Sequence, residues 1–165
     1  MRPSVNRLLL VLLILFVVAT DQWTKHLARE HLPLHERHYA GVLSLVYVEN
    51  EGAFLSLGSN LPRTARVAIF TVAVGLAVVV ALFLLLSARV HGLDAVAVAL
   101  IGAGGIGNLV DRLARHGRVT DFLYLSAGPG SFLHTGVFNV ADMAITGGVI
   151  WMLISSFVPK KQQSA

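Results

Sequence analysis

The sequence predicts an α-helical polytopic membrane protein with four transmembrane helices and a small β-sheet at one membrane face. Three observations predict this class: 55% of the 165 residues are hydrophobic, only 13% are charged, and apolar runs occur that are long enough to cross a bilayer. Soluble domains carry about a quarter charged residues. The length suits a single domain, which we expect to cover residues 1–165.

Four segments are expected to span the membrane. The first, at about residues 5–27, has an apolar core that begins after Arg2 and Arg7. No good small-x-small cleavage site follows it, so it predicts an uncleaved helix rather than a signal peptide. The second, at about residues 67–87, is the clearest, because it holds twenty residues without a charge. The third, at about residues 95–111, is rich in small residues, and the fourth covers about residues 137–158.

The two longer connections, at about residues 28–66 and 112–136, contain β-forming segments. The piece "GVLSLVYVENEGAFLSLG" predicts two short strands around a turn at residues 49–52. The pieces "GRVTDFLYL" and "SFLHTGVFNV" predict further strands around "AGPG". These loops follow the first and the third spans, so both lie at the same membrane face and can meet there.

Charge and residue types exclude several functions. The chain has no cysteine, so disulfides, thiolate nucleophiles and cysteine metal sites are excluded. The 13 lysines and arginines are scattered, which is typical of membrane-flanking charge and not of nucleic-acid binding. His31, His35 and His38 do not form H-E-x-x-H, so we expect no metal. A count of basic residues favours cytoplasmic loops but the N-terminal arginines argue the reverse, so charge alone does not set the orientation.

A glycine motif in the third span suggests a dinucleotide-binding loop. Gly102, Gly104 and Gly107 follow the spacing G-x-G-x-x-G, and the acidic Asp121 comes downstream. In the nucleotide fold that acid closes a strand, whereas Asp121 opens "DFLYL", and the remaining chain is a membrane span. We therefore interpret the glycines as helix-packing residues, with Ala103 and Gly107 as a small-xxx-small pair.

Four sets of polar residues lie in or beside the predicted spans, where apolar residues are expected. All four sets fall at the same membrane face. A charged side chain within a span costs roughly 2.5–3.5 kcal/mol on insertion scales, so such residues tend to face the bundle interior and mark function. The groups are Asp21 with Lys25, Asn108 with Asp111 and Arg112, Asn139 with Asp142, and Asp121 in the preceding loop. A helix-end ion pair would also explain the first group, and interfacial snorkelling the second.

Asp121 and Asp142 together suggest aspartic-protease chemistry. Two neighbouring carboxyl groups do not both ionise easily, so they share one proton. The ionised carboxylate can deprotonate a water, and the protonated carboxyl can polarise a carbonyl and later protonate the leaving amine. Ser126 and Ser131 have no convincing base, which argues against a serine mechanism.

The order of the motifs resembles the lipoprotein signal peptidases, the signal peptidase II family, over nearly the whole chain. The matching stretches are "DQWTK" (21–25), "ENEGAF" (49–54), "GGIGNLVDR" (104–112), "GRVTDFL" (117–123) and "FNVADMAI" (138–145). One departure is mild: Phe54 follows Ala53 directly, where the family often has another small residue. It concerns local loop contacts and not the chemistry.

The resemblance implies a bacterial inner-membrane aspartic endopeptidase that cuts diacylglyceryl-modified prolipoproteins just before the lipid-modified cysteine, with Asp121 and Asp142 as the catalytic dyad. The positions that bind substrate or hold the dyad are Asn50, Gly52, Asn108, Arg112 and Asn139, and those that support the local structure are Asp21, Lys25 and Asp111. It also implies cytoplasmic termini, an extracytoplasmic sheet that cradles substrate, and an adjoining mobile loop-helix. We expect no cofactor and a monomer surrounded by membrane lipids.

Two other classes stay open. A transporter or channel would also carry intramembrane aspartate and arginine, although the β-rich loops and the lack of an internal repeat argue against it. A non-catalytic paralogue could sequester the substrate or an inhibitor, although the presence of both aspartates argues against that class.

Overall fold

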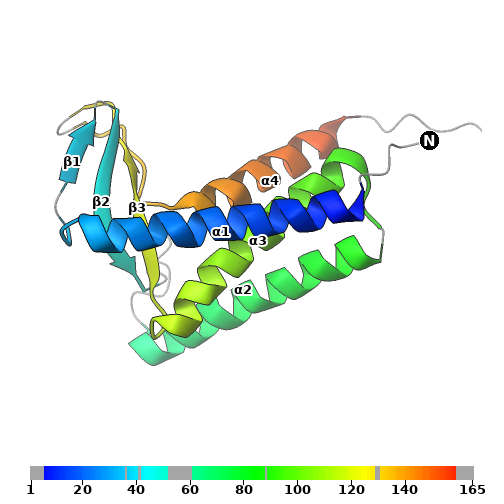
Figure 1. The fold of residues 1–165 in the computed structure, drawn as a ribbon, viewed down its shortest axis with the longest axis horizontal. Helices are drawn as coiled ribbons and strands as arrows, with labels where there is room; N and C mark the ends of the chain where they lie inside the picture. The colour runs from blue at the N-terminus through cyan, green and yellow to red at the C-terminus, as the bar shows by residue number, and fades with distance from the viewer. Residues whose placement is uncertain are drawn as a thin grey trace, which may run out of the picture.

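The computed structural model describes residues 6–35, 37–40 (backbone alone), 42–51, 61–87, 89–128 and 131–158. They form, in chain order, α1 (Arg7–His31), β1 (Arg37–Ala40), β2 (Leu43–Asn50), α2 (Arg63–Leu86), α3 (Gly92–Ala114), β3 (Val119–Leu125) and α4 (Val140–Phe157). The four helices run lengthwise, and the three strands stand across one end of the helix bundle (Figure 1).

All four helices are long and apolar enough to cross a membrane, which confirms the predicted class. α3 is the central helix: it packs against α1, α2 and α4. In its most apolar window, 56% of the residues are buried inside the protein, against 11% for α2 and for α4. The exposed faces of the outer helices are lined with large apolar side chains, as a lipid-facing surface requires.

The helices do not end where the apolar runs end. α1 continues to His31 and α2 already begins at Arg63, because helical hydrogen bonds can continue into polar sequence at the membrane face. α3 extends past the expected 95–111 in both directions. α4 instead begins three residues later than expected, because Asn139 caps it: the Asn139 side chain accepts a hydrogen bond from the Asp142 backbone N–H (2.9 Å).

The sheet is antiparallel in the order β1-β2-β3, so the two β-rich loops meet as expected. β2 pairs with β3 on either side of an irregularity between Leu45 and Val48, and Val48 lies opposite Asp121. The second strand expected after residue 52 lies outside the described residues. Of the helices that the structure describes, none lies in these loops, so the expected loop-helix is not among them.

The prediction of a strand at "SFLHTGVFNV" was wrong. This segment runs beside β3 but makes only isolated bridges, Leu123 with Phe138 and Ser126 with His134. One reason is that the Leu125 backbone N–H donates to the Thr135 side-chain oxygen (3.0 Å), in addition to the backbone contacts of that region. A side-chain acceptor at this position interrupts a regular ladder.

Glycines allow α3 to approach its neighbours closely. The three glycines of the G-x-G-x-x-G stretch lie inside α3 and not in a loop between a strand and a helix, which excludes the dinucleotide-loop geometry. A side chain at Gly104 would overlap the backbone carbonyl of Ala141 on α4. A Cβ at Gly148 on α4 would lie 2.6 Å from the carbonyl oxygen of Ala97 on α3. In both cases the added atom would meet the backbone of the facing helix, which can move away only if the two helices separate.

We expect Gly148→Ala to lower the thermal stability of the purified protein in detergent, because the new methyl group has to push α4 away from α3. Gly147→Ala is the matched control: a Cβ there meets nothing within 4 Å, and alanine is favoured over glycine in a helix by about 1 kcal/mol. The melting temperatures of the two variants should therefore move in opposite directions. Equal shifts would contradict the close packing of α3 on α4.

Candidate active site

Asp121 and Asp142 lie next to one another, linked by one asparagine. Asp121 is in the middle of β3, and Asp142 is in the first turn of α4. The Asn139 side-chain amide donates to Asp121 Oδ1 (2.7 Å), and the Asn139 backbone N–H donates to Asp142 Oδ2 (3.2 Å). Asp121 is 2% exposed, whereas Asp142 is partly exposed.

Two further amides hold the remaining oxygens of the pair. Asn50, the last residue of β2, donates from Nδ2 to Asp121 Oδ2 (2.9 Å). Asn108, on α3, donates from Nδ2 to Asp142 Oδ1 (2.8 Å). Each of the four carboxyl oxygens therefore has an N–H donor, which fixes the position of both carboxyl groups.

The pKa of Asp121 is raised to about 7. Burial is the largest cause, followed by repulsion from the Asp142 carboxylate, while the hydrogen bonds from Asn50 and Asn139 oppose the shift. A carboxyl group that titrates near neutral pH can donate a proton at working pH, as a general acid must.

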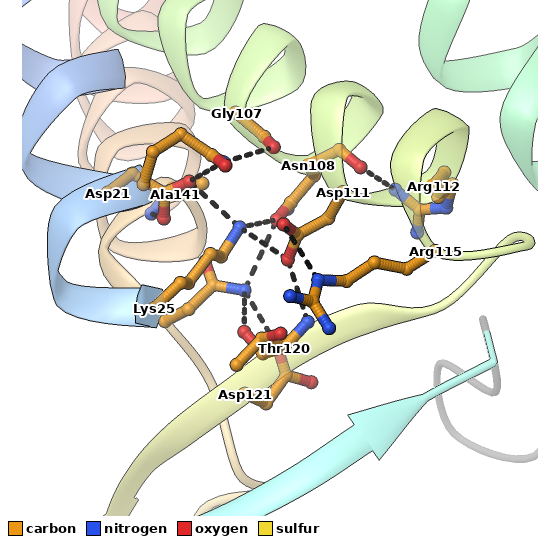
Figure 2. Close-up of polar contacts among 12 residues, drawn as sticks. Asp21, Lys25, Gly107, Asn108, Asp111, Arg112, Arg115, Thr120, Asp121 and Ala141 are labelled. Atoms are coloured by element: carbon orange, nitrogen blue, oxygen red, sulfur yellow. Dashed lines mark hydrogen bonds and ion pairs between the residues drawn. The ribbon is translucent and has the colours of Figure 1, made fainter. Parts of the chain in front are cut away.

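A buried cluster of charged residues lies on the helix side of Asp121 (Figure 2). The Lys25 ammonium is fully buried and lies 2.8 Å from Asp21 Oδ2 and 3.5 Å from Asp111 Oδ2. It also donates to Asn108 Oδ1 (2.9 Å). Buried charges need such partners, because an unpaired one is strongly destabilising.

The same cluster joins the helices to the sheet. Asp111 Oδ2 accepts a hydrogen bond from the Thr120 backbone N–H of β3 (2.9 Å). Asp21 Oδ1 accepts from the Ala141 backbone N–H at the start of α4 (2.9 Å). The residues next to both members of the aspartate pair, Thr120 and Ala141, are therefore held by carboxylates of α3 and α1.

Arg112 lies on the same face of α3 as Asn108. Its Nη1 donates to the Asn108 carbonyl oxygen (3.3 Å), and its guanidinium interacts electrostatically with Asp142, Asp121 and Asp111. Among the described residues its buried Nε has no hydrogen-bond partner. The remaining expected site residue, Gly52, lies outside the described residues.

The sequence alone did not indicate a network of ion pairs beside the site. Glu49 Oε2 lies 2.6 Å from Arg118 Nη1, and Glu51 Oε1 lies 3.3 Å from Arg118 Nε. Although burial acts to raise it, the pKa of Glu49 is lowered by hydrogen bonds from Tyr47 and Arg118 and by the nearby arginine charges. The register of β2 on β3 brings these residues together, and no spacing in the sequence reveals that register.

The fold and the site define a class of protein. It is a multi-pass membrane protein with two aspartates at one end of its helix bundle, both hydrogen-bonded by asparagine amides. Such a pair is the arrangement expected of an aspartic protease. Across the described parts of the chain, no group of three or more histidines and acidic residues could hold a metal ion.

Comparison with known proteins gives the family. The family model described as Signal peptidase (SPase) II matches residues 13–158. The lipoprotein signal peptidase of Syntrophus aciditrophicus is 36% identical over 90% of this chain and 91% of its own length. Those of Deinococcus radiodurans and Francisella tularensis subsp. novicida are 35% and 32% identical, over 92% and 98% of this chain and 80% and 98% of their own lengths.

Two solved structures of bacterial membrane enzymes share the fold. One has a TM-score of 0.79 at 23% identity and covers 100% of this chain and 99% of its own. The other has a TM-score of 0.76 at 24% identity and covers 97% and 99%. The family itself is shown by the family model over residues 13–158 and by relatives 32–36% identical over at least 90% of the chain: the chain belongs to the signal peptidase II family. It is an enzyme of the bacterial membrane, an aspartic protease, and its family supports signal-peptide removal from prolipoproteins as its activity.

Proposed function

We propose that this enzyme cuts diacylglyceryl-modified prolipoproteins just before the lipid-modified cysteine, with Asp121 and Asp142 as its catalytic pair. The observation that carries the proposal is the link Asp121–Asn139–Asp142, which holds two carboxyl groups together where the spans meet the sheet. Both aspartates and all their amide donors come from one chain, so we propose a monomer and a single peptidase domain. The relatives named lipoprotein signal peptidase support the substrate class.

In the proposed reaction one carboxyl group starts ionised and the other protonated. The ionised carboxylate takes a proton from water as the water oxygen attacks the scissile carbonyl carbon, and the protonated carboxyl gives its proton to the carbonyl oxygen. A gem-diol results. When the C–N bond breaks, the first carboxyl gives its proton to the leaving amine, and the second regains one from a diol hydroxyl. The pair then stands in its starting state.

The site is suited to a substrate that is itself a membrane span. A cut at the end of the helix bundle would admit water to the aspartates while the diacylglyceryl chains remain in the bilayer. We propose that the termini are cytoplasmic and that this face is extracytoplasmic. In the same proposal, Asn50, Gly52, Asn108, Arg112 and Asn139 bind the substrate backbone or hold the pair, and Asp21, Lys25 and Asp111 support them.

The test is to incubate the purified enzyme in liposomes with a prolipoprotein in its diacylglyceryl-modified and its unmodified form. The proposal expects a gel shift to the mature size with the modified form and little or none with the unmodified form. Equal cleavage of both would contradict the lipid requirement. Binding without cleavage would favour a non-catalytic paralogue, and solute flux in the same liposomes a transporter.

The pH dependence of cleavage tests the state of Asp121. Since its pKa is about 7, Asp121 loses its proton as the pH rises through neutrality, and kcat/KM should fall on that alkaline limb. The Asn50 hydrogen bond stabilises the ionised form, so Asn50→Ala should move the limb to higher pH.

Tyr47→Phe is the control for Asn50→Ala, because Tyr47 is on the same strand but donates to Glu49 instead (3.0 Å). Its alkaline limb should coincide with that of the wild type. An Asn50→Ala limb that stays in place, or moves to lower pH, would show that Asp121 is not the group titrating there.

A further inference from the structure

The orientation of the Asn108 amide is fixed from behind by Lys25. A lysine ammonium can only donate hydrogen bonds, so the Asn108 atom that lies 2.9 Å from it has to be the side-chain oxygen. The Asn139 side-chain nitrogen also donates to this atom (3.2 Å), so the atom again has to be an oxygen. The NH2 group of Asn108 must then point the other way, where it donates to Asp142 Oδ1 (2.8 Å).

The Lys25 ammonium is itself held in a fixed position. Its side chain is fully buried, and its three N–H donors meet three acceptors: Asp21 at 2.8 Å, Asn108 at 2.9 Å and Asp111 at 3.5 Å. Figure 2 shows the ammonium between α1 and α3, pointing toward Asn108 and Asp111. A structural ion pair would need only the two carboxylates, so the contact with Asn108 is the part that ion pairing does not explain.

The surroundings of the two aspartates are unequal. Asp142 lies in the first turn of α4, where the helix dipole favours a negative charge, and it accepts from Asn108 and from the Asn139 backbone N–H. Asp121 is buried in the middle of a strand, without a helix end, and its pKa is raised. Charged groups that lie around the pair and its supporting carboxylates are Asp21, Lys25 and Arg29 from α1, Asp111, Arg112 and Arg115 from α3, and the aspartates themselves.

We propose that Lys25 is a positioning residue that acts through Asn108, and that the fixed Asn108 amide makes Asp142 the base and Asp121 the acid of the proposed reaction. The water proton then passes to Asp142 while the Asp121 proton passes to the carbonyl oxygen. After the C–N bond breaks, Asp142 has given that proton to the amine and Asp121 has regained one from the diol. The assignment rests on the proposed function.

Lys25→Met tests the relay because methionine keeps the shape of the side chain and removes its donors. We expect kcat to fall about 10- to 100-fold, the order expected when a reacting group is misplaced, with little change in KM. This fall should appear in kcat per folded enzyme, because a loosened Asn108 amide no longer holds the Asp142 carboxyl in position. A residue with only a structural role would lower the rate in proportion to the folded fraction, and kcat per folded enzyme would stay at the wild-type value.

Lys25→Met leaves Asp21 without its cation, while Asp111 keeps Arg29 (3.8 Å) and Arg115 (3.9 Å). The loss at Asp21 could still unfold the protein. The double variant Asp21→Asn/Lys25→Met removes one acid and one base together, so the net charge of the cluster is kept. Its thermal denaturation shows whether it folds, and its kcat per folded enzyme should still be lowered with little change in KM. Asn108→Ala keeps the entire charged cluster and should lower kcat on its own, again with little change in KM.

A double-mutant cycle decides whether Lys25 acts through Asn108. If it does, Lys25→Met should have no further effect on kcat in the Asn108→Ala background. Effects on kcat that multiply in the double variant, or an unchanged kcat in Asn108→Ala, would overturn the relay. If the wild type cleaves and both aspartate variants do not, such a result removes the relay alone; if the wild type does not cleave, the proposed function itself fails.

Discussion

Asp121→Asn and Asp142→Asn should each reduce cleavage of a diacylglyceryl-modified prolipoprotein by at least about 1,000-fold, because each removes a group that must carry a proton in the reaction. Asparagine keeps the size of the side chain and an acceptor oxygen, so the hydrogen bonds that involve Asn139 are largely kept. The loss should therefore appear in kcat while both variants stay folded. Initial rates and thermal denaturation of the purified variants measure the two effects separately.

Asp94→Asn is the matched control for this pair. Asp94 is also an acidic residue of a spanning helix, but it lies in the first turn of α3 and accepts from the Trp151 side chain (3.2 Å). Its substitution should leave the cleavage rate within about two-fold of the wild type, as expected for a residue outside a reacting unit. Cleavage that survives substitution of Asp121 or of Asp142 would remove that aspartate from the mechanism.

Asp111→Ala should lower the free energy of unfolding by about 3–5 kcal/mol, the range for breaking a buried ion pair by removing one partner. Asp111 is 2% exposed, pairs with Lys25 and accepts the Thr120 backbone N–H, so its loss leaves a buried charge and a buried amide without this partner. Asp111→Asn should cost less, because its amide oxygen can still accept from Thr120. Denaturation in mixed micelles compares the two variants.

Asp94→Ala serves as the control for Asp111→Ala, since it removes an acid from the same helix in a contact that is exposed. It should cost less than about 1 kcal/mol, as exposed polar contacts generally do. Equal costs at positions 94 and 111 would show that the buried cluster does not hold β3 to α3.

The helices were predictable because a bilayer imposes a length and a composition that any sequence must satisfy. Twenty residues without a charge sufficed for α2, and the polar residues that interrupt the other spans, such as Asp21 and Asn108, indicated the interior face of the bundle. The contact partners of these polar residues were harder to predict from the sequence. Asp111 is i+3 from Asn108 and could be placed on the same face, whereas Lys25 and Asn108 are separated by 83 positions. Only the packing of α1 on α3 brings those two together.

The loops were predicted less well, for a related reason. β2 and β3 follow from β-branched residues, but their register, which places Val48 opposite Asp121, depends on an irregularity that no residue pattern indicates. β1 is too short and too polar to stand out. The segment after residue 130 has strand-forming residues yet makes only isolated bridges. Local preference does not determine whether such a segment finds a continuous partner.

Mass spectrometry of both products released from a diacylglyceryl-modified prolipoprotein would identify the bond that is cut, with Asp142→Asn enzyme as the blank. We predict an intact signal peptide and a mature chain whose first residue is the lipid-modified cysteine, both absent from the blank. A cut at any other bond would contradict the proposed specificity, and the same products from Asp142→Asn would contradict the role of the aspartate pair.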